Sequence, residues 1–157
     1  MTGAYEDGLR LLSRRSLTRQ EVSERLRRRG HNGEDIDQAI DRLAEIKAID
    51  DAAVARSWIT ATAAARGRGR ERAIAELVSR GVDREVASAA WSEAADDDAV
   101  EETTLLARAV RRRLGLPAAP VKKARLARVY NALLFEGFGA NETEAALVPY
   151  GFEGDDP

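Results

Sequence analysis

Apolar residues recur every three or four positions along most of the chain, which predicts amphipathic helices separated by short turns. The spacing is clearest where Ile74, Leu77 and Val78 form one apolar stripe and the chain restarts after Gly81. Alternation of apolar and polar residues never persists beyond about four positions, which is short for a half-buried strand. The pattern therefore predicts an all-α protein.

The same helical plan occurs three times. In each copy a leucine precedes a glycine by four residues, and the pairs are Leu26 with Gly30, Leu77 with Gly81, and Leu133 with Gly137. The glycines are 51 and 56 residues apart (81 − 30 and 137 − 81). A period near fifty is typical of tandem helical arrays. We therefore predict an elongated array of three three-helix repeats at 1–49, 50–98 and 99–150, with a frayed tail at 151–157.

Capping signals mark the expected helix starts. Thr18 and Glu21 form a capping box, in which each side chain bonds the other residue's backbone amide. We expect later helices to start at Asn32, at Asp50 or Asp51, at Asp83, at Pro120 and at Asn141, the last with Glu144. In the sixth helix we expect Val86 and Ala90 to face inward and Trp91 to lie on a flank.

The net charge of −2 hides a segregation of charge along the chain. Basic residues outnumber acidic ones by eight to two in 8–30, but acidic residues outnumber basic ones by seven to two in 31–55. The alternation continues to the segment 103–130, which holds eight basic residues and no acid. Stacked repeats would place the basic helices on one face and the acidic helices on another. Simple solubilisation of an Ala-rich helical protein is the alternative.

Few residues suggest catalysis or metal binding. The chain has no cysteine, and its single histidine, His31, has no second histidine as a metal partner, so we interpret it as a turn residue. Asp50 and Asp51 have a sufficient role in capping. The glycines around Arg68 lack the GK[ST] of a phosphate loop. We expect no enzyme, no cofactor and no metal, and, without a membrane span or export signal, a cytoplasmic monomer.

Basic clusters are the remaining candidates for binding. Guanidinium groups pair with phosphate or carboxylate, so the clusters suit a nucleic-acid backbone or an acidic protein surface. Around Gly67 and Gly69 they form a loop without an apolar anchor. Trp58 and Trp91 lie outside these clusters, and we expect both to pack. The candidate binding residues are Arg14, Arg15, Arg66, Arg68, Arg70, Arg72, Arg111, Arg112, Lys122, Lys123 and Arg125.

Four stretches carry a family resemblance: SRRSLTRQEVSERLRRRG, IDDAAVARSWI, RGRGRERAIAELVSRGVDREVASAAW and KKARLARVYNALLFEGF. In this order they resemble the RecX family of bacterial recombination regulators, from about Tyr5 to Leu147. The resemblance implies a cytoplasmic, non-catalytic protein of three-helix repeats that lies along the groove of the RecA recombinase filament on DNA. It also implies modulation, usually inhibition, of the ATP hydrolysis, coprotease activity and strand exchange of RecA.

Two other functions remain open from the residues alone. A general DNA-binding helical module would use the arginine clusters for weak contacts to the DNA backbone. A helical scaffold would instead present its basic face to an acidic protein partner.

Overall fold

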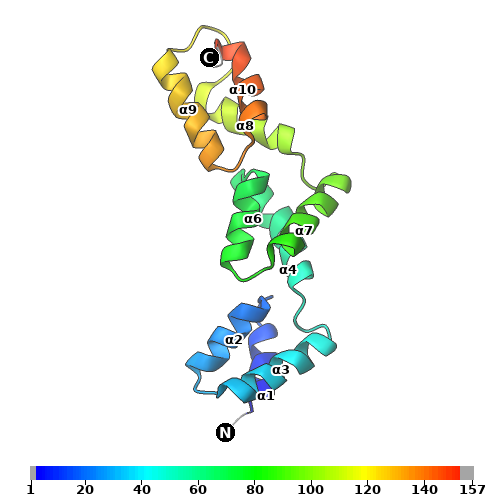
Figure 1. Ribbon diagram of the computed structural model, residues 1–157. Coiled ribbons are helices and arrows are strands. Elements are labelled where there is room, and N and C mark those ends of the chain that lie inside the picture. Colours follow the sequence, from blue (N-terminus) through cyan, green and yellow to red (C-terminus); the bar gives the residue numbers. More distant parts are fainter. Residues whose placement is uncertain (1–2, 153–157) are drawn as a thin grey trace.

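The computed structural model describes residues 3–152, which form helices joined by turns and short connections, without a strand, as predicted (Figure 1). We keep the predicted boundaries as definitions and call 1–49, 50–98 and 99–150 units 1, 2 and 3. Unit 1 holds α1 (Ala4–Leu12), α2 (Arg19–Arg28) and α3 (Gly33–Glu45). Unit 2 holds α4 (Asp51–Trp58), the π-helical turn η1 (Ile59–Ala63), α5 (Ala64–Arg66), α6 (Arg70–Ser79) and α7 (Arg84–Asp96). Unit 3 holds α8 (Glu102–Leu114), α9 (Lys123–Phe135), α10 (Ala140–Leu147) and the 3₁₀ turn η2 (Val148–Tyr150).

Each unit is a three-helix group, because α4, η1 and α5 run on as one helical rod. The extensive helix–helix contacts lie within the units, as between α1 and α3, α4 and α7, or α9 and α10. Along the molecule the middle helices α2, α6 and α9 lie one beyond another, with the amino terminus at one end and the carboxyl terminus at the other (Figure 1). The fold is therefore the elongated array that the repeat predicted.

The three middle helices end in the same way. Gly30, Gly81 and Gly137 have φ of +91°, +90° and +94°, a left-handed conformation that glycine adopts without strain. The next residue in each case donates its N–H to the carbonyl of the leucine five positions earlier, at 3.1–3.3 Å. That leucine is fully buried in all three units. The spacing seen in the sequence is thus the signature of one helix end used three times.

Most helix starts agree with the capping predictions, and two do not. Thr18 and Glu21 form the capping box, and the side chains of Asn32, Asp50 and Asp83 accept N–H bonds from the first turns they precede. The prediction for α10 was wrong, because the helix begins at Ala140 after an extended Gly139. Asn141 and Glu144 instead lie inside α10, and Glu144 accepts a bond from the Tyr130 hydroxyl at 3.3 Å.

The start of α9 also differs from the prediction. Pro120 does not open this helix, which begins at Lys123 after Lys122. Residues 115–122 form a bent, non-helical connection instead, and the N–H of Val121 donates to the carbonyl of Tyr150 at 3.4 Å. Both this connection and α9 are longer than their counterparts in unit 2, and both contribute to the larger second glycine spacing.

Two buried clusters make up the core. One lies wholly in unit 1 and includes Leu26, Ile36 and Leu43. The other runs without interruption through units 2 and 3, from Ala55 to Tyr150. Trp91 belongs to this second core and is buried, so its predicted place on a flank was wrong, while Val86 is only half-buried. Unit 1 therefore has a core of its own, whereas units 2 and 3 share one.

Packing continues slightly past the predicted end of unit 3. The ring of Phe152 stacks on that of Tyr130, with centroids 5.4 Å apart. The rest of the predicted tail, 153–157, lies outside the described residues. Within residues 3–152 no helix is both long and apolar enough to cross a membrane.

Candidate functional site

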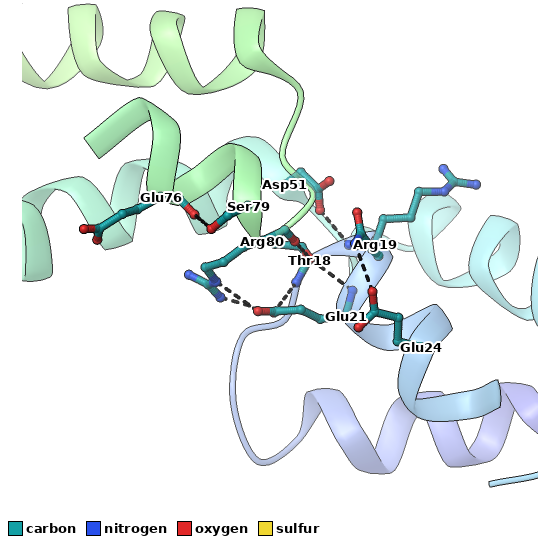
Figure 2. Close-up of polar contacts among 9 residues, drawn as sticks. Thr18, Arg19, Glu21, Glu24, Asp51, Glu76, Ser79 and Arg80 are labelled. Carbon is teal, nitrogen blue, oxygen red and sulfur yellow. Dashed lines mark hydrogen bonds and ion pairs between the residues drawn. The ribbon is translucent and has the colours of Figure 1, made fainter. Parts of the chain in front are cut away.

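The first joint connects units 1 and 2 through polar groups (Figure 2). The Thr18 hydroxyl donates to the Arg80 carbonyl at 2.7 Å, and the Arg80 guanidinium donates to the Glu21 carboxylate at 2.9 and 3.2 Å. Beside them, the N–H of Arg19 donates to Asp51 at 2.8 Å. We call this set, together with Gly81, joint 1. It seats the carboxyl end of α6 on the amino end of α2.

Glu21 has its charge stabilised in joint 1. Burial by itself would raise the pKa of this carboxyl, but hydrogen bonds from Arg80 and from the Thr18 N–H outweigh that effect. The charges of Arg80 and Arg15 act in the same direction. The pKa of Glu21 therefore lies below its usual range, and joint 1 is held by an ionised group.

The second joint repeats the same geometry with backbone groups. The carboxyl end of α9 sits on the amino end of α6, where the N–H of Gly69 donates to the Glu136 carbonyl at 2.9 Å and that of Glu71 to the Gly137 carbonyl at 3.2 Å. The N–H of Arg70 donates to the Glu102 carboxylate at 3.0 Å, as that of Arg19 does to Asp51. We call this set joint 2. The three middle helices therefore stack end to end.

Glycine lets the two backbone segments of joint 2 approach each other closely. A Cβ at Gly69 would lie 2.5 Å from the backbone of Gly137, and a Cβ at Gly137 would overlap the backbone N of Arg72. Gly69 is buried. No apolar side chain is needed to anchor this loop, in line with the prediction, because backbone hydrogen bonds fix it against unit 3 and it contributes to the array itself.

The arginines in this loop and just after it are engaged in ion pairs. Arg68 and Arg72 both contact the Glu76 carboxylate, at 3.1 and 2.9 Å. Arg70 pairs with Glu71 at 2.6 Å and donates to the Ser88 hydroxyl at 2.7 Å. These three candidate binding residues are half-buried and also serve the fold.

The remaining candidate residues are exposed. Arg14 and Arg15 follow α1 in unit 1, and Arg66 ends α5. Arg111 and Arg112 lie in the last turn of α8, while Lys122, Lys123 and Arg125 lie at the start of α9. The structure brings the clusters of units 2 and 3 together, because the Arg112 guanidinium lies 3.4 Å from where a Cβ of Gly67 would be. It leaves Arg14 and Arg15 in unit 1, apart from them.

Charge also differs between the helices of one unit. In unit 1, α2 carries four arginines against two glutamates, and α3 carries five acids against one arginine. In unit 3, α9 carries three cations and no acid, and α10 carries two glutamates and no cation. The middle helices stack, so the cations of α2 and α9 belong to one column. The predicted segregation of basic and acidic helices is present at both ends of the array.

His31 has a structural role that the sequence did not reveal. Its ring contacts the Asp7 carboxylate at 2.9 Å, and the Arg29 guanidinium contacts the same carboxylate at 3.2 Å. The hydrogen bond from His31 is the main cause that lowers the pKa of Asp7, and the charge of Arg29 adds to it against the opposing effect of burial. Within residues 3–152 no group of three or more His, Cys, Asp or Glu side chains is arranged to hold a metal ion.

The residues of joint 1 were not predicted as a site. The sequence showed Thr18 and Glu21 as a cap and gave no signal that Arg80 lies against them. The repeat itself held a usable signal, because Arg19 and Arg70 are 51 residues apart and their acidic partners, Asp51 and Glu102, are also 51 residues apart.

Comparison with known proteins identifies the family. Residues 4–43 match the model of the first three-helix domain of RecX, and residues 50–90 match that of the second. A protein of Thermobifida fusca called regulatory protein RecX is 36% identical over 132 residues, which is 84% of this chain and 70% of that protein. A protein of the same name from a Mycobacterium strain is 40% identical over 106 residues, 68% of this chain and 56% of that protein.

Solved structures agree with the fold. The crystal structure of RecX from Lactobacillus salivarius superposes with a TM-score of 0.73 at 23% identity, over 94% of both chains. A second RecX crystal structure gives 0.79 at 18% identity, over 91% of this chain and 69% of the other. The fold is therefore that of these structures, and the matched domain models together with the Thermobifida relative show that this chain belongs to the RecX family of regulatory proteins.

Proposed function

We propose that this chain binds the RecA recombinase filament on DNA and inhibits its ATP hydrolysis, coprotease activity and strand exchange. The supporting observation is that a RecX-family chain has its three units stacked end to end in an elongated array. In this proposal the chain acts in the cytoplasm as a monomer and has no catalytic activity of its own.

The repeated units suit a repeated target. A filament presents the same surface once per subunit, and an array with exposed cations in each of its three units can contact several subunits at once. Several weak contacts made together bind far more tightly than one, by about a hundredfold or more when the geometry permits. The array thus supports binding to a polymer better than binding to a single small partner.

The exposed cations are the proposed contact residues. We assign Arg14, Arg15, Arg66, Arg111, Arg112, Lys122, Lys123 and Arg125 to contacts with the filament or with the DNA that it carries. Arg68, Arg70 and Arg72 keep a secondary place in the proposal, because their ion pairs must be loosened before they bind a partner.

Recombinase ATP hydrolysis tests the proposal. On single-stranded DNA we expect the rate to fall as the protein is titrated, and the double variant R111A/R112A to need a five- to thirtyfold higher concentration, for a loss of about 1–2 kcal/mol. The control R56A/R84A removes the same charge from exposed arginines already paired with Glu93 and Glu71. Unchanged hydrolysis at saturating protein would discard the function.

A general DNA-binding module is the second candidate. The acid-free stretch 103–135, which contains all of α9 and most of α8, favours it. Binding to naked duplex DNA would then weaken roughly tenfold or more between low and physiological salt. A salt-independent affinity, or none, would discard this candidate.

A further inference from the structure

The carboxyl end of α2 has the same form as the two helix ends that make joints. Gly30 has the left-handed φ of Gly81 and Gly137, and the N–H of His31 donates to the Leu26 carbonyl at 3.3 Å. Gly81 and Gly137 each seat on the start of another helix. Gly30 instead is exposed, and nothing lies within 4 Å of where its Cβ would be.

The residue before Gly30 is also the one that a joint needs. Arg29 follows the last residue of α2, as Arg80 follows the last residue of α6. In joint 1, Arg80 binds Glu21, the third residue of α2. The Arg29 side chain is 41% exposed and contacts the Asp7 carboxylate of its own unit at 3.2 Å, a pair that must be loosened before Arg29 binds a partner. The α2 end thus has an arginine and a glycine at the positions that Arg80 and Gly81 occupy in joint 1.

The other end of the column presents the matching half with the wrong charge. The start of α9 is the amino end of a middle helix, like the starts of α2 and α6, and within residues 3–152 no other middle helix is seated on it. Lys122 and Arg125 occupy the positions that Thr18 and Glu21 occupy at the start of α2. Both cations are exposed. A second copy that brought its Arg29 to this place would meet two like charges.

We propose that the two ends of the array correspond in position to the two halves of a third joint. Like charge on both ends prevents two copies of the free protein from forming that joint. The Arg29–Gly30 end therefore accepts the first turn of a helix from another protein, provided that the turn has a hydroxyl or glycine at its cap and a carboxylate at its third position. A second copy of this chain fails that requirement through Lys122 and Arg125. The inference rests on the joints and is independent of the proposed function.

Recoding one end of the array tests the inference. The variant K122T/R125E gives the start of α9 the cap and carboxylate of α2. Since the two ends of one chain cannot meet, copies should join head to tail in open chains. By light scattering we expect the mass to rise with concentration above the monomer's 17.1 kDa and to fall again with added salt, while the unaltered protein stays at 17.1 kDa.

Two further variants separate the joint from general charge effects. Adding R29Q to K122T/R125E should restore the monomer, whereas adding R28Q, which removes an equal charge from the exposed neighbouring position, should not. Circular dichroism establishes that each variant is helical before its mass is interpreted. A helical K122T/R125E that stays monomeric at all concentrations, or association that R29Q leaves intact, would overturn the inference.

Discussion

Removing the Arg80 side chain should release unit 1 from the rest of the array. Arg80 supplies the two charge-assisted bonds to Glu21, and its side chain is 24% exposed. Hydrogen bonds to charged groups contribute about 1.5–3 kcal/mol each when buried, and partial exposure lowers the value for the pair to about 1–2 kcal/mol. In R80A the bond from the Thr18 hydroxyl to the backbone carbonyl of residue 80 remains, so joint 1 should weaken and not vanish.

Because the cores of unit 1 and of units 2 and 3 are separate, loss of the Arg80 bonds should change the orientation of unit 1 and leave its folding intact. The core of unit 1 does not continue into unit 2, so R80A should leave each core folded while unit 1 changes its orientation. Small-angle scattering should show a broader distribution of distances, and calorimetry should show a transition for unit 1 below that of units 2 and 3. The matched control is R84A, since Arg84 forms an exposed pair with Glu71 within unit 2.

Two results with R80A and R84A would contradict this role of the Arg80–Glu21 pair. If R80A gives the scattering profile and the single transition of the unaltered protein, the Glu21 pair does not hold joint 1. If R84A has the same effect as R80A, the cause is the general loss of positive charge. Either result would return Glu21 to the role of a simple helix cap.

Two further predictions concern the joints. In G69A the new methyl would meet the backbone of Gly137 and Phe138, so joint 2 should open or shift. We expect the free energy of unfolding, measured by urea denaturation, to fall by about 1–3 kcal/mol. A stability equal to that of the unaltered protein would contradict the close approach. Acidification should open joint 1: the folded pKa of Glu21 is lowered, so its contribution is present above the unfolded value of about 4.5 and is lost as pH falls through the folded pKa. Scattering recorded from pH 6 to pH 2 should show that opening, and E21Q should already be open at pH 6.

The local features of the fold were readable from the sequence because they depend on neighbouring residues. The helix end at Gly81 needs only a leucine four residues earlier, and the cap at Thr18 needs only an acid three residues later. The prediction for the start of α9 was wrong, although proline is common in the first turn of a helix. The connection that begins at Gly115 continues past Pro120 to Lys122, and it sets the actual start. The start of α10 failed because Gly139 needs no side chain to cap a helix, so Asn141 was a false signal.

The candidate site was harder to predict because its partners are distant in sequence. Glu21 and Arg80 are 59 positions apart, and the capping role of Glu21 already explained its presence. The arginines near Gly69 looked exposed because the sequence showed no apolar residue there. Gly69 packs on another helix end through its backbone, and such a contact leaves no hydrophobic pattern in the sequence. The partial burial of Arg68 and Arg72 and their ion pairs with Glu76 could therefore not be anticipated.

The two joints occupy equivalent positions but use different chemistry, and this difference decides where the array can bend. Joint 2 joins backbone to backbone beside a continuous core, so movement there would break packing as well as hydrogen bonds. Joint 1 depends on Glu21, Arg80 and Asp51 side chains, whose bonds water can replace at a smaller cost. In the proposed binding mode, units 2 and 3 would therefore contact the filament as one body. Unit 1 would adjust to the next subunit through joint 1, so variants of Arg80 should change the affinity for a filament more than the affinity for short DNA.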